Sequence, residues 1–146
     1  MSATPERGNV LAFDFGERRV GVAVGELGVR VAHPLTTLHV RSDADRIGQT
    51  QALVREWEPV LFVVGRPAHS DGRLHELAGR CERFARRLSA TFRVPALMVD
   101  ETLSSHAAGQ SLTQAGVSGR RQARLLDQVA AQHILQSYFD GAHATA

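Results

Sequence analysis

Cysteine and long apolar segments are the first things that this sequence lacks. Cys81 is the single cysteine among 146 residues, so the chain forms no internal disulfide. The N-terminal residues MSATPERGN are polar and contain none of the apolar core that a signal peptide needs. No apolar run is long enough to span a membrane. These absences exclude a disulfide-stabilised scaffold and predict a cytoplasmic protein without a membrane segment.

Lysine is missing altogether, and all 17 basic residues are arginines. They stand against 15 acidic residues, which leaves a formal net charge of only +2. A charge this small does not by itself predict nucleic-acid binding, and a GC-rich genome is the simplest reason for the choice of arginine. Arginine nevertheless suits phosphate well, because its planar guanidinium donates two parallel hydrogen bonds and stays charged. The arginines are therefore candidates for phosphate contacts.

The length of the chain suits one compact domain, and hydrophobic residues make up 43% of it, enough for a real core. We expect a single domain over residues 1–146, with flexible tails at 1–8 and 141–146. Short apolar runs separated by turns predict an antiparallel meander of three strands, at residues 10–15, 20–24 and 29–40. Helices and strands then alternate, with helices predicted at 43–57, 74–92, 106–115 and 120–140 and strands at 60–64 and 94–99. This order predicts an α/β fold whose mixed five-stranded sheet, a meander followed by parallel strands, is flanked by helices.

Three acidic residues stand out by their positions. Asp14 interrupts the first apolar strand, where an isolated carboxylate is costly. Glu101 follows a predicted strand, and sites in α/β sheets gather beyond the carboxyl ends of strands. Asp127 lies among apolar residues of the last helix. Each also has an ordinary explanation. Asp14 could cap the turn that starts at Gly16, and Glu101 could simply end its strand. Asp127 could pair with Arg124 in solvent.

Taken together, the three acids favour a metal site. Three carboxylates that converge on one point repel each other, and divalent cations relieve that repulsion. Their hard oxygen atoms suit Mg²⁺ or Mn²⁺. Two such ions about 4 Å apart can hold both the attacking and the leaving oxygen of a phosphoryl transfer, with no histidine or nucleophilic side chain required. The acids therefore predict metal-dependent phosphoryl-transfer chemistry.

Several blocks of the sequence resemble one known family. They are Leu11–Gly16 followed by Val20–Ala23, Val63–Pro67 with Asp71–Gly72, Asp100–Ser105, and Leu126–Ala131 with Ile134–Phe139. In order and spacing these blocks resemble the YqgF/RuvX family, over about residues 9–140. The resemblance implies an RNase H-like fold and a nuclease that processes pre-16S rRNA or resolves Holliday junctions.

The same resemblance implies roles for individual residues. Asp14, Glu101 and Asp127 match the acids that bind the catalytic metal, so we expect them to be catalytic and to hold Mg²⁺ or Mn²⁺, as two ions. Substrate phosphates have a larger set of candidate partners, namely Arg18, Arg19, Arg66, Arg120, Arg121 and Arg124. The arginines between residues 80 and 87 lie off the apolar stripe of their helix, and for them we expect a solvated surface.

Four functional hypotheses follow. The first is an endonuclease that matures the 5′ end of pre-16S rRNA, with structured RNA as its partner. The second is a Holliday junction resolvase acting on four-way DNA, which needs two active sites and hence a homodimer. A non-catalytic RNA-binding module is a third, although all three acids are present. An ATPase of the actin and sugar-kinase kind is a fourth, but that fold needs two lobes and this chain holds one.

Overall fold

The computed structural model of the chain describes residues 5–66, 72–100, 119–141 and 144–145. Its elements in chain order are β1 (Asn9–Asp14), β2 (Arg19–Glu26), β3 (Ala32–His39), α1 (Asp43–Trp57), β4 (Leu61–Arg66), α2 (Gly72–Phe92), β5 (Ala96–Asp100), α4 (Gly119–Phe139) and β6 (Ala144–Thr145). These elements include every predicted strand and helix except the helix at 106–115, which lies outside the described residues. Within the described ranges, no helix combines the length and the apolar character needed to cross a membrane.

The strands form one sheet in the order β3-β2-β1-β4-β5-β6. β1, β2 and β3 pair antiparallel, whereas β1, β4 and β5 run parallel, so the predicted mixed sheet is confirmed. One difference lies at the C-terminus. Residues 141–146 are predicted to be a flexible tail, but Ala144 and Thr145 form β6, which pairs antiparallel with Val99 and Met98 of β5. A strand of two residues is too short to show any periodic pattern in the sequence.

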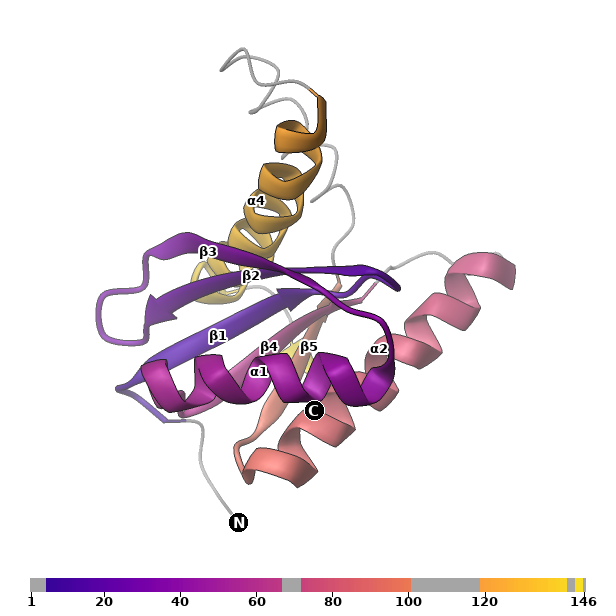
Figure 1. Cartoon of the computed structure of the whole chain (residues 1–146). Coiled ribbons are helices and arrows are strands. Elements are labelled where there is room, and N and C mark those ends of the chain that lie inside the picture. The colour runs from indigo at the N-terminus through magenta and orange to yellow at the C-terminus, as the bar shows by residue number, and fades with distance from the viewer. Residues whose placement is uncertain (1–4, 67–71, 101–118, 142–143, 146) are drawn as a thin grey trace.

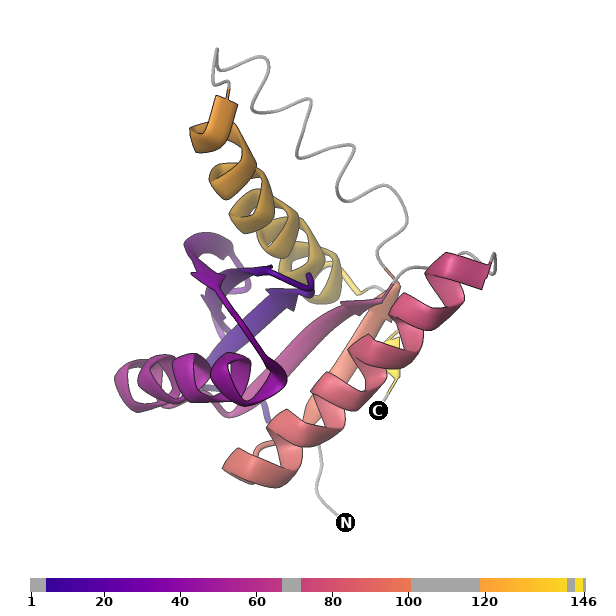
Figure 2. The same cartoon turned by 45° about the vertical axis from the view of Figure 1, so that its right-hand side comes forward.

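Alternate residues of the central strands enter two hydrophobic cores on opposite faces of the sheet. In β1, Leu11 and Phe13 pack with α1 and α2, whereas Val10 and Ala12 pack with α4. Figures 1 and 2 show α1 and α2 on one side of the sheet and α4 on the other. The fold thus has three layers. Because side chains alternate along a strand, an even-numbered residue of β1 faces α4.

β3 begins three residues later than the sequence predicts, at Ala32. The residues before it form a tight turn, in which the N–H groups of Val29 and Arg30 donate to the carbonyl of Glu26 at 3.1 and 2.8 Å. Arg30 adopts a left-handed backbone conformation, with φ of 61°. The apolar side chains of Val29 and Val31, which suggested a strand, are 67% and 46% exposed. The hairpin needs these residues for its turn because β2 continues to Glu26.

α1 begins where the sequence predicts because its first turn is capped. Ser42 has an extended backbone, and its hydroxyl accepts a hydrogen bond from the Asp45 N–H at 3.0 Å. The helix ends at Trp57, where Glu58 turns left-handed and its N–H donates to the Val54 carbonyl at 2.8 Å. The cap at each end fixes which residues of α1 face the sheet.

α4 lies across the meander and is held there by small residues and a polar contact. Ala130 and Ala131 are buried against the sheet, as expected for a helix that approaches it closely. The Thr37 hydroxyl of β3 donates to the Arg124 carbonyl at 2.7 Å. These contacts set the position of α4 on the sheet, and hence the position of Asp127.

Candidate active site

Asp14 is the last residue of β1 and follows the alternation of that strand. Ala12 belongs to the core beneath α4, so Asp14, two residues further on, also faces α4. The side chain is half-buried. Phe15, the next residue, belongs to the core under α1 and α2. The carboxylate that interrupts the first apolar run therefore lies at the carboxyl end of its strand, on the side of the last helix.

Gly21 joins Asp14 to Asp127. It is directly opposite Asp14 in the antiparallel pair of β1 and β2. A Cβ atom at position 21 would lie 1.9 Å from the carbonyl oxygen of Asp127 and 3.0 Å from its Cα. The backbone of α4 therefore rests directly on the backbone of β2 at this point, which only glycine allows. Two acids that are far apart in the sequence are brought to the two sides of one glycine.

Asp14 and Asp127 line a common pocket of about 470 Å³. The rest of the wall comes from the turn between β1 and β2, so that the lining residues are Asp14, Phe15, Gly16, Glu17, Arg18, Arg19 and Asp127. The structure thus brings together the first and the last of the three predicted acids and places two of the predicted arginines beside them. Carboxylates and guanidinium groups around one open pocket suit a cation and a phosphate as joint occupants.

The carboxylate of Asp127 is mostly buried and forms an ion pair with Arg19. Arg19 Nε lies 2.9 Å from Asp127 Oδ2, and the Asp127 side chain is 16% exposed. Among the described residues, the Arg19 contact has the distance of a hydrogen bond but falls short of its ideal geometry, so it is best described as an ion pair. Burial raises the pKa of Asp127 above its usual value of 3.8, while the charge of Arg19, the hydrogen bond from Arg19 and the charge of His39 act in the opposite direction. The site therefore favours an additional cation close to Oδ2.

Glu101, the second predicted acid, lies outside the described residues. β5 ends immediately before it, at Asp100, and Asp100 pairs in register with Arg66 of β4. Because β1, β4 and β5 run parallel, all three end at the edge of the sheet that carries Asp14. Among the residues that the structure describes, no group of three or more His, Cys, Asp or Glu side chains could hold a metal ion. The contribution of Glu101 stays a prediction.

Two of the predicted phosphate-binding arginines contact carboxylates in this structure. Arg19 pairs with Asp127, as described above. Arg66 donates to Asp100 Oδ1 from Nε at 3.1 Å and from Nη2 at 3.0 Å, and its Nη1 lies 3.4 Å from Glu82. A phosphate would have to compete with these carboxylates for either guanidinium.

The remaining candidates divide by their exposure. The side chain of Arg18 is exposed at the pocket of Asp14, and that of Arg124 is exposed on α4 beside β3. Arg120 and Arg121 lie in the first turn of α4, and the structure describes no position for their side chains. Arg18 is thus the exposed guanidinium nearest in the sequence to Asp14, and the best placed of the candidates to meet a phosphate.

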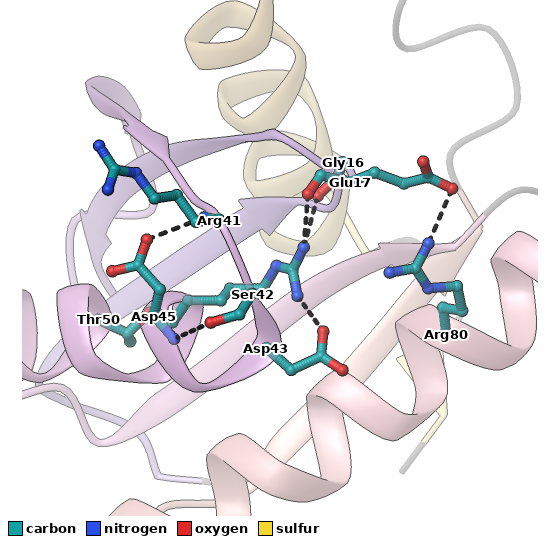
Figure 3. Close-up of polar contacts among 9 residues, drawn as sticks. Gly16, Glu17, Arg41, Ser42, Asp43, Asp45, Thr50 and Arg80 are labelled. Atoms are coloured by element: carbon teal, nitrogen blue, oxygen red, sulfur yellow. Dashed lines mark hydrogen bonds and ion pairs between the residues drawn. The ribbon is translucent and has the colours of Figure 1, made fainter.

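Sequence reasoning missed Arg46 of α1, which holds the turn between β1 and β2. Its side chain is 2% exposed, and its Nη2 donates to the carbonyls of Gly16 at 3.2 Å and Glu17 at 2.9 Å. Its guanidinium carbon lies 4.6 Å from the centre of the Phe15 ring, and its Nη1 pairs with Asp43. Figure 3 shows Gly16 and Glu17 at the end of these dashed contacts. The turn that lines the pocket is therefore fixed by a buried cation.

A signal for this role is present in the sequence. Arg46 recurs with Thr50, Leu53 and Trp57 at spacings of four, three and four, so it falls on the stripe of α1 that faces the core. Thr50 on the same stripe is fully buried, and its hydroxyl donates to the Arg46 carbonyl at 2.8 Å. A charged residue on such a stripe must have polar partners, and the carbonyls of the turn are those partners.

Arg80 of α2 contacts the same turn from the other side. Its Nη1 donates to Glu17 Oε1 at 2.8 Å (Figure 3). Its guanidinium carbon lies 5.5 Å from the centre of the Phe15 ring. The sequence analysis expected a solvated surface for the arginines between residues 80 and 87. Arg80 departs from this expectation because the turn after β1 offers it both a carboxylate and an aromatic face.

Comparison with known proteins identifies relatives along the whole length of the chain. A family model described as "RuvX: Holliday junction resolvase" matches residues 8–141. A protein of Methylobacillus flagellatus named "Putative pre-16S rRNA nuclease" is 52% identical over 139 residues, 95% of each chain. A protein of Nitrosomonas europaea with the same name is 50% identical over 139 residues, 95% of this chain and 94% of the relative.

Solved structures agree with these sequence matches at the level of the fold. The RuvC protein of T. thermophilus in complex with a Holliday junction substrate superposes with a TM-score of 0.55 at 18% identity, over 90% of this chain and 93% of that one. A second T. thermophilus RuvC structure gives a TM-score of 0.53 at 16% identity, over 94% and 98% of the two chains. These likenesses confirm the expected RNase H-like fold. The family model spans almost all of the chain, and these two relatives are 52% and 50% identical to it. The chain therefore belongs to the RuvX family.

Proposed function

We propose that this chain is a metal-dependent endonuclease that hydrolyses nucleic-acid phosphodiesters at the pocket between β1 and α4. One observation carries the proposal. Asp14 and Asp127 line one pocket on either side of Gly21, and the buried Oδ2 of Asp127 lacks an aligned hydrogen-bond donor within the described residues. A buried carboxylate oxygen beside a single, poorly aligned donor still has a lone pair with which to bind a divalent cation.

The residues present fit a hard divalent cation. Carboxylate oxygens from Asp14 and Asp127 would hold Mg²⁺ or Mn²⁺, with the carboxylate of Glu101 as a third ligand and room for two ions. When bound, such ions supply Lewis-acid stabilisation of the charge that develops on phosphate oxygens during hydrolysis. The pairing of Asp127 with Arg19 fits this role, because a side chain that is 46% exposed can leave the carboxylate when a cation arrives.

The arginines of the turn would orient the substrate. Arg18 is exposed at the mouth of the pocket, and Arg19 would become available to a phosphate once it leaves Asp127. Arg46 and Arg80 would keep the turn itself still, because both bind Glu17 from outside the pocket. Phosphodiester hydrolysis depends mainly on positioning and on charge stabilisation, so a rigid turn of this kind would serve the reaction directly.

We infer that the substrate is the precursor of 16S rRNA, cut at its 5′ end. The reason is that relatives 52% and 50% identical to this chain are named "Putative pre-16S rRNA nuclease". The description of the family model favours a second candidate, the Holliday junction of DNA recombination and repair. Resolution of a junction cuts two strands symmetrically and would require a homodimer. Both substrates lie in the cytoplasm of a bacterial cell, so we also propose a cytoplasmic location.

The test is a cleavage assay on both substrates. The full chain is incubated with a pre-16S rRNA fragment that contains the mature 5′ end, or with a synthetic four-way DNA junction, in Mg²⁺ or Mn²⁺. Asp14→Asn and Asp127→Asn should each lower the rate by about a hundredfold or more, because each removes an expected metal ligand. Asp140→Asn, which changes an exposed acid just beyond α4, is the matched control and should cleave like the original chain.

Circular dichroism must show that all three variants stay folded. Full cleavage by folded Asp14→Asn would refute the proposed chemistry. Cleavage of the junction but not of the RNA would transfer the proposal to the resolvase. A chain that sediments only as a monomer would count against the resolvase, because symmetric cleavage of a junction needs two active sites.

A further inference from the structure

A second pocket lies on the other side of the turn that lines the first one. Phe15 contributes to the walls of both. The second pocket has a volume of about 190 Å³ and is formed between α1 and α2. Its walls carry two aromatic rings and four arginines, which are Phe15, Phe84, Arg46, Arg80, Arg83 and Arg87. The same walls contain one acid, Asp43, so positive charge dominates this pocket.

Three of these arginines come from one face of α2. Arg80, Arg83 and Arg87 follow each other at spacings of three and four residues, which places them on one side of the helix. Arg86 lies on another side and lines a separate pocket with residues of β5. Among the described residues, Arg83 and Arg87 form no ion pair with a carboxylate, and both side chains are exposed. Like charges this close repel each other, and an anion between them relieves the repulsion.

Arg46 places a buried positive charge in the wall of this pocket. Its side chain is only 2% exposed. Its Nη1 pairs with Asp43, and its Nη2 donates to the carbonyls of Gly16 and Glu17. Its Nε is also buried and has no hydrogen-bond acceptor within the described part of the chain. A buried donor of a charged group without an acceptor is unfavourable. An oxyanion in the pocket would be attracted by this buried positive charge, while the exposed guanidinium groups of Arg83 and Arg87 could donate hydrogen bonds to it.

Arg80 is poised to change partners. Its bond to Glu17 is 2.8 Å long, but the side chains of the pair are 34% and 72% exposed. Exposed ion pairs of this kind contribute little to stability, so a phosphate can replace Glu17 at little cost. The guanidinium itself is held in place by the Phe15 ring, 5.5 Å away. The pocket thus combines a fixed cation, Arg46, with one that can be released.

From these contacts we propose that the pocket between α1 and α2 binds a phosphate group of a nucleic acid strand, in addition to the phosphate at Asp14 and Asp127. The two pockets flank the same turn, so a strand that crosses Gly16 and Glu17 would place one phosphate on each side of it. The role of this pocket as a second anchor for the substrate rests on the proposed nuclease function. Phosphate binding by the pocket can be tested without a cleavage assay.

The first test is a titration of the full chain with inorganic phosphate, without divalent cation. NMR of the arginine Nε–H groups monitors the binding. Phosphate should shift the Arg46 Nε–H resonance, and Arg83→Gln/Arg87→Gln should reduce that shift strongly. The matched control is Arg55→Gln/Arg86→Gln, which removes the same charge from exposed positions outside the pocket and should leave the shift unchanged. No shift, or an equal reduction in both double variants, would overturn the proposal.

The second test asks which phosphate is bound. A fluorescent single-stranded RNA of twelve nucleotides, with either a phosphate or a hydroxyl at its 5′ end, is titrated in EDTA over a range of salt concentrations. If the pocket takes a backbone phosphate, Arg83→Gln/Arg87→Gln weakens both RNAs by roughly tenfold and lowers the salt slope by about 0.7, the value for one phosphate of a single strand. If it takes a terminal phosphate, only the phosphorylated RNA is weakened.

Failure of this proposal is distinguishable from failure of the nuclease. Equal RNA binding by Arg83→Gln/Arg87→Gln and by its control would remove the second anchor, whatever the cleavage assay gives. Conversely, full cleavage by Asp14→Asn would refute the nuclease chemistry and leave the phosphate shift of Arg46 as it is. The phosphate NMR and the RNA titration both use the intact chain and need no divalent metal, whereas the cleavage assay does.

Discussion

Gly21 and Asp127 are in backbone contact. A Cβ atom at position 21 would lie 1.9 Å from the Asp127 carbonyl oxygen, a distance that no pair of unbonded atoms tolerates. The same glycine is the register partner of Asp14. The absence of one side chain therefore determines how closely the two acids of the pocket approach each other. Several expectations about stability and activity follow from this contact and from the arginines around the turn.

Gly21→Ala should separate α4 from β2. The atoms that the new methyl group meets belong to the backbone, so no side chain can move aside, and we expect a loss of about 3 kcal/mol in the free energy of unfolding. Cleavage should fall as well, since Asp127 would be displaced from Asp14. Urea denaturation and the cleavage assay measure the two effects.

Gly48→Ala is the control for this substitution. Gly48 lies in the middle of α1, and an added Cβ would meet nothing within 4 Å. Alanine is the better helix former, so this variant should gain about 0.5–1 kcal/mol and cleave normally. If alanine at the two positions had the same effect, the proposed contact between strand and helix would be wrong.

Arg46→Gln should be among the most destabilising substitutions at a charged position. It removes a buried guanidinium that serves the carbonyls of Gly16 and Glu17 and the face of Phe15, and we expect a loss of about 3 kcal/mol. Arg46→Lys should restore little of it, because an ammonium group cannot span two carbonyls and stack on a ring. Thermal or urea unfolding measures both variants.

Arg55→Gln, at an exposed position of the same helix, is the comparison for Arg46 and should stay within about 0.5 kcal/mol of the original chain. Should Arg46→Lys be as stable as the original chain, the guanidinium would not be needed. A point charge would then be sufficient to hold the turn.

The alternation of apolar residues explains why much of the fold could be predicted. Leu11, Phe13 and the apolar stripe of α2 show their periods plainly, and those elements lie where the sequence places them. The turn before β3 was missed because Val29 and Val31 are apolar and yet exposed. Local composition cannot show that β2 continues two residues beyond its predicted end, to Glu26, so that the turn comes two residues later.

The candidate site shows the same division. Asp14 could be found because a carboxylate inside an apolar strand is an anomaly in the sequence itself. The pairing of Asp127 with Arg19, rather than with Arg124 on its own helix, depends on where α4 rests on the sheet. That position is set by Gly21, and the sequence alone does not show which glycine packs against which helix. The stripe of α1 marks Arg46 as core-facing, but the carbonyls of Gly16 and Glu17 that it binds come from a distant turn and cannot be identified from the sequence.

Divalent cations should stabilise the protein through the two acids of the pocket. At a Mg²⁺ or Mn²⁺ concentration about a hundredfold above the dissociation constant, binding adds about 2.7 kcal/mol to the free energy of unfolding. For a chain of this size the melting temperature should rise by about 5–10 °C. Differential scanning calorimetry with and without the cation measures the shift.

Asp14→Asn and Asp127→Asn should each lose most of that stabilisation, whereas Asp140→Asn should keep it. Ca²⁺ is an informative second ion, since it shares the preference for oxygen ligands but not the strict octahedral geometry of Mg²⁺. An equal rise in melting temperature for all the variants would place the cation elsewhere on the molecule.

Asp127 and Glu26 should give opposite dependences of stability on pH in the metal-free protein. Burial raises the pKa of Asp127, so the folded chain holds its proton more tightly than the unfolded chain does. The free energy of unfolding contributed by this group is therefore present at low pH and is lost as the pH rises through the folded pKa. Asp127→Asn cannot ionise, so it should be more stable than the original chain at neutral pH, with the difference vanishing below the usual value of 3.8. Arg19, half-exposed, stays hydrated in this variant.

Glu26 behaves in the other sense. The Gly8 N–H donates to its Oε1 and the Val29 N–H to its Oε2, both at 3.0 Å, and the first of these bonds is the main reason that the pKa of Glu26 is lowered from 4.5. Its stabilisation is present above 4.5 and is lost as the pH falls through the folded pKa, so Glu26→Gln should be destabilised at neutral pH and equal to the original chain in acid. Urea denaturation in EDTA between pH 3 and pH 8 compares the two variants directly. Curves that diverge from the original chain in the same direction would mean that burial does not govern Asp127, and that its carboxylate is already neutralised by Arg19 without a metal.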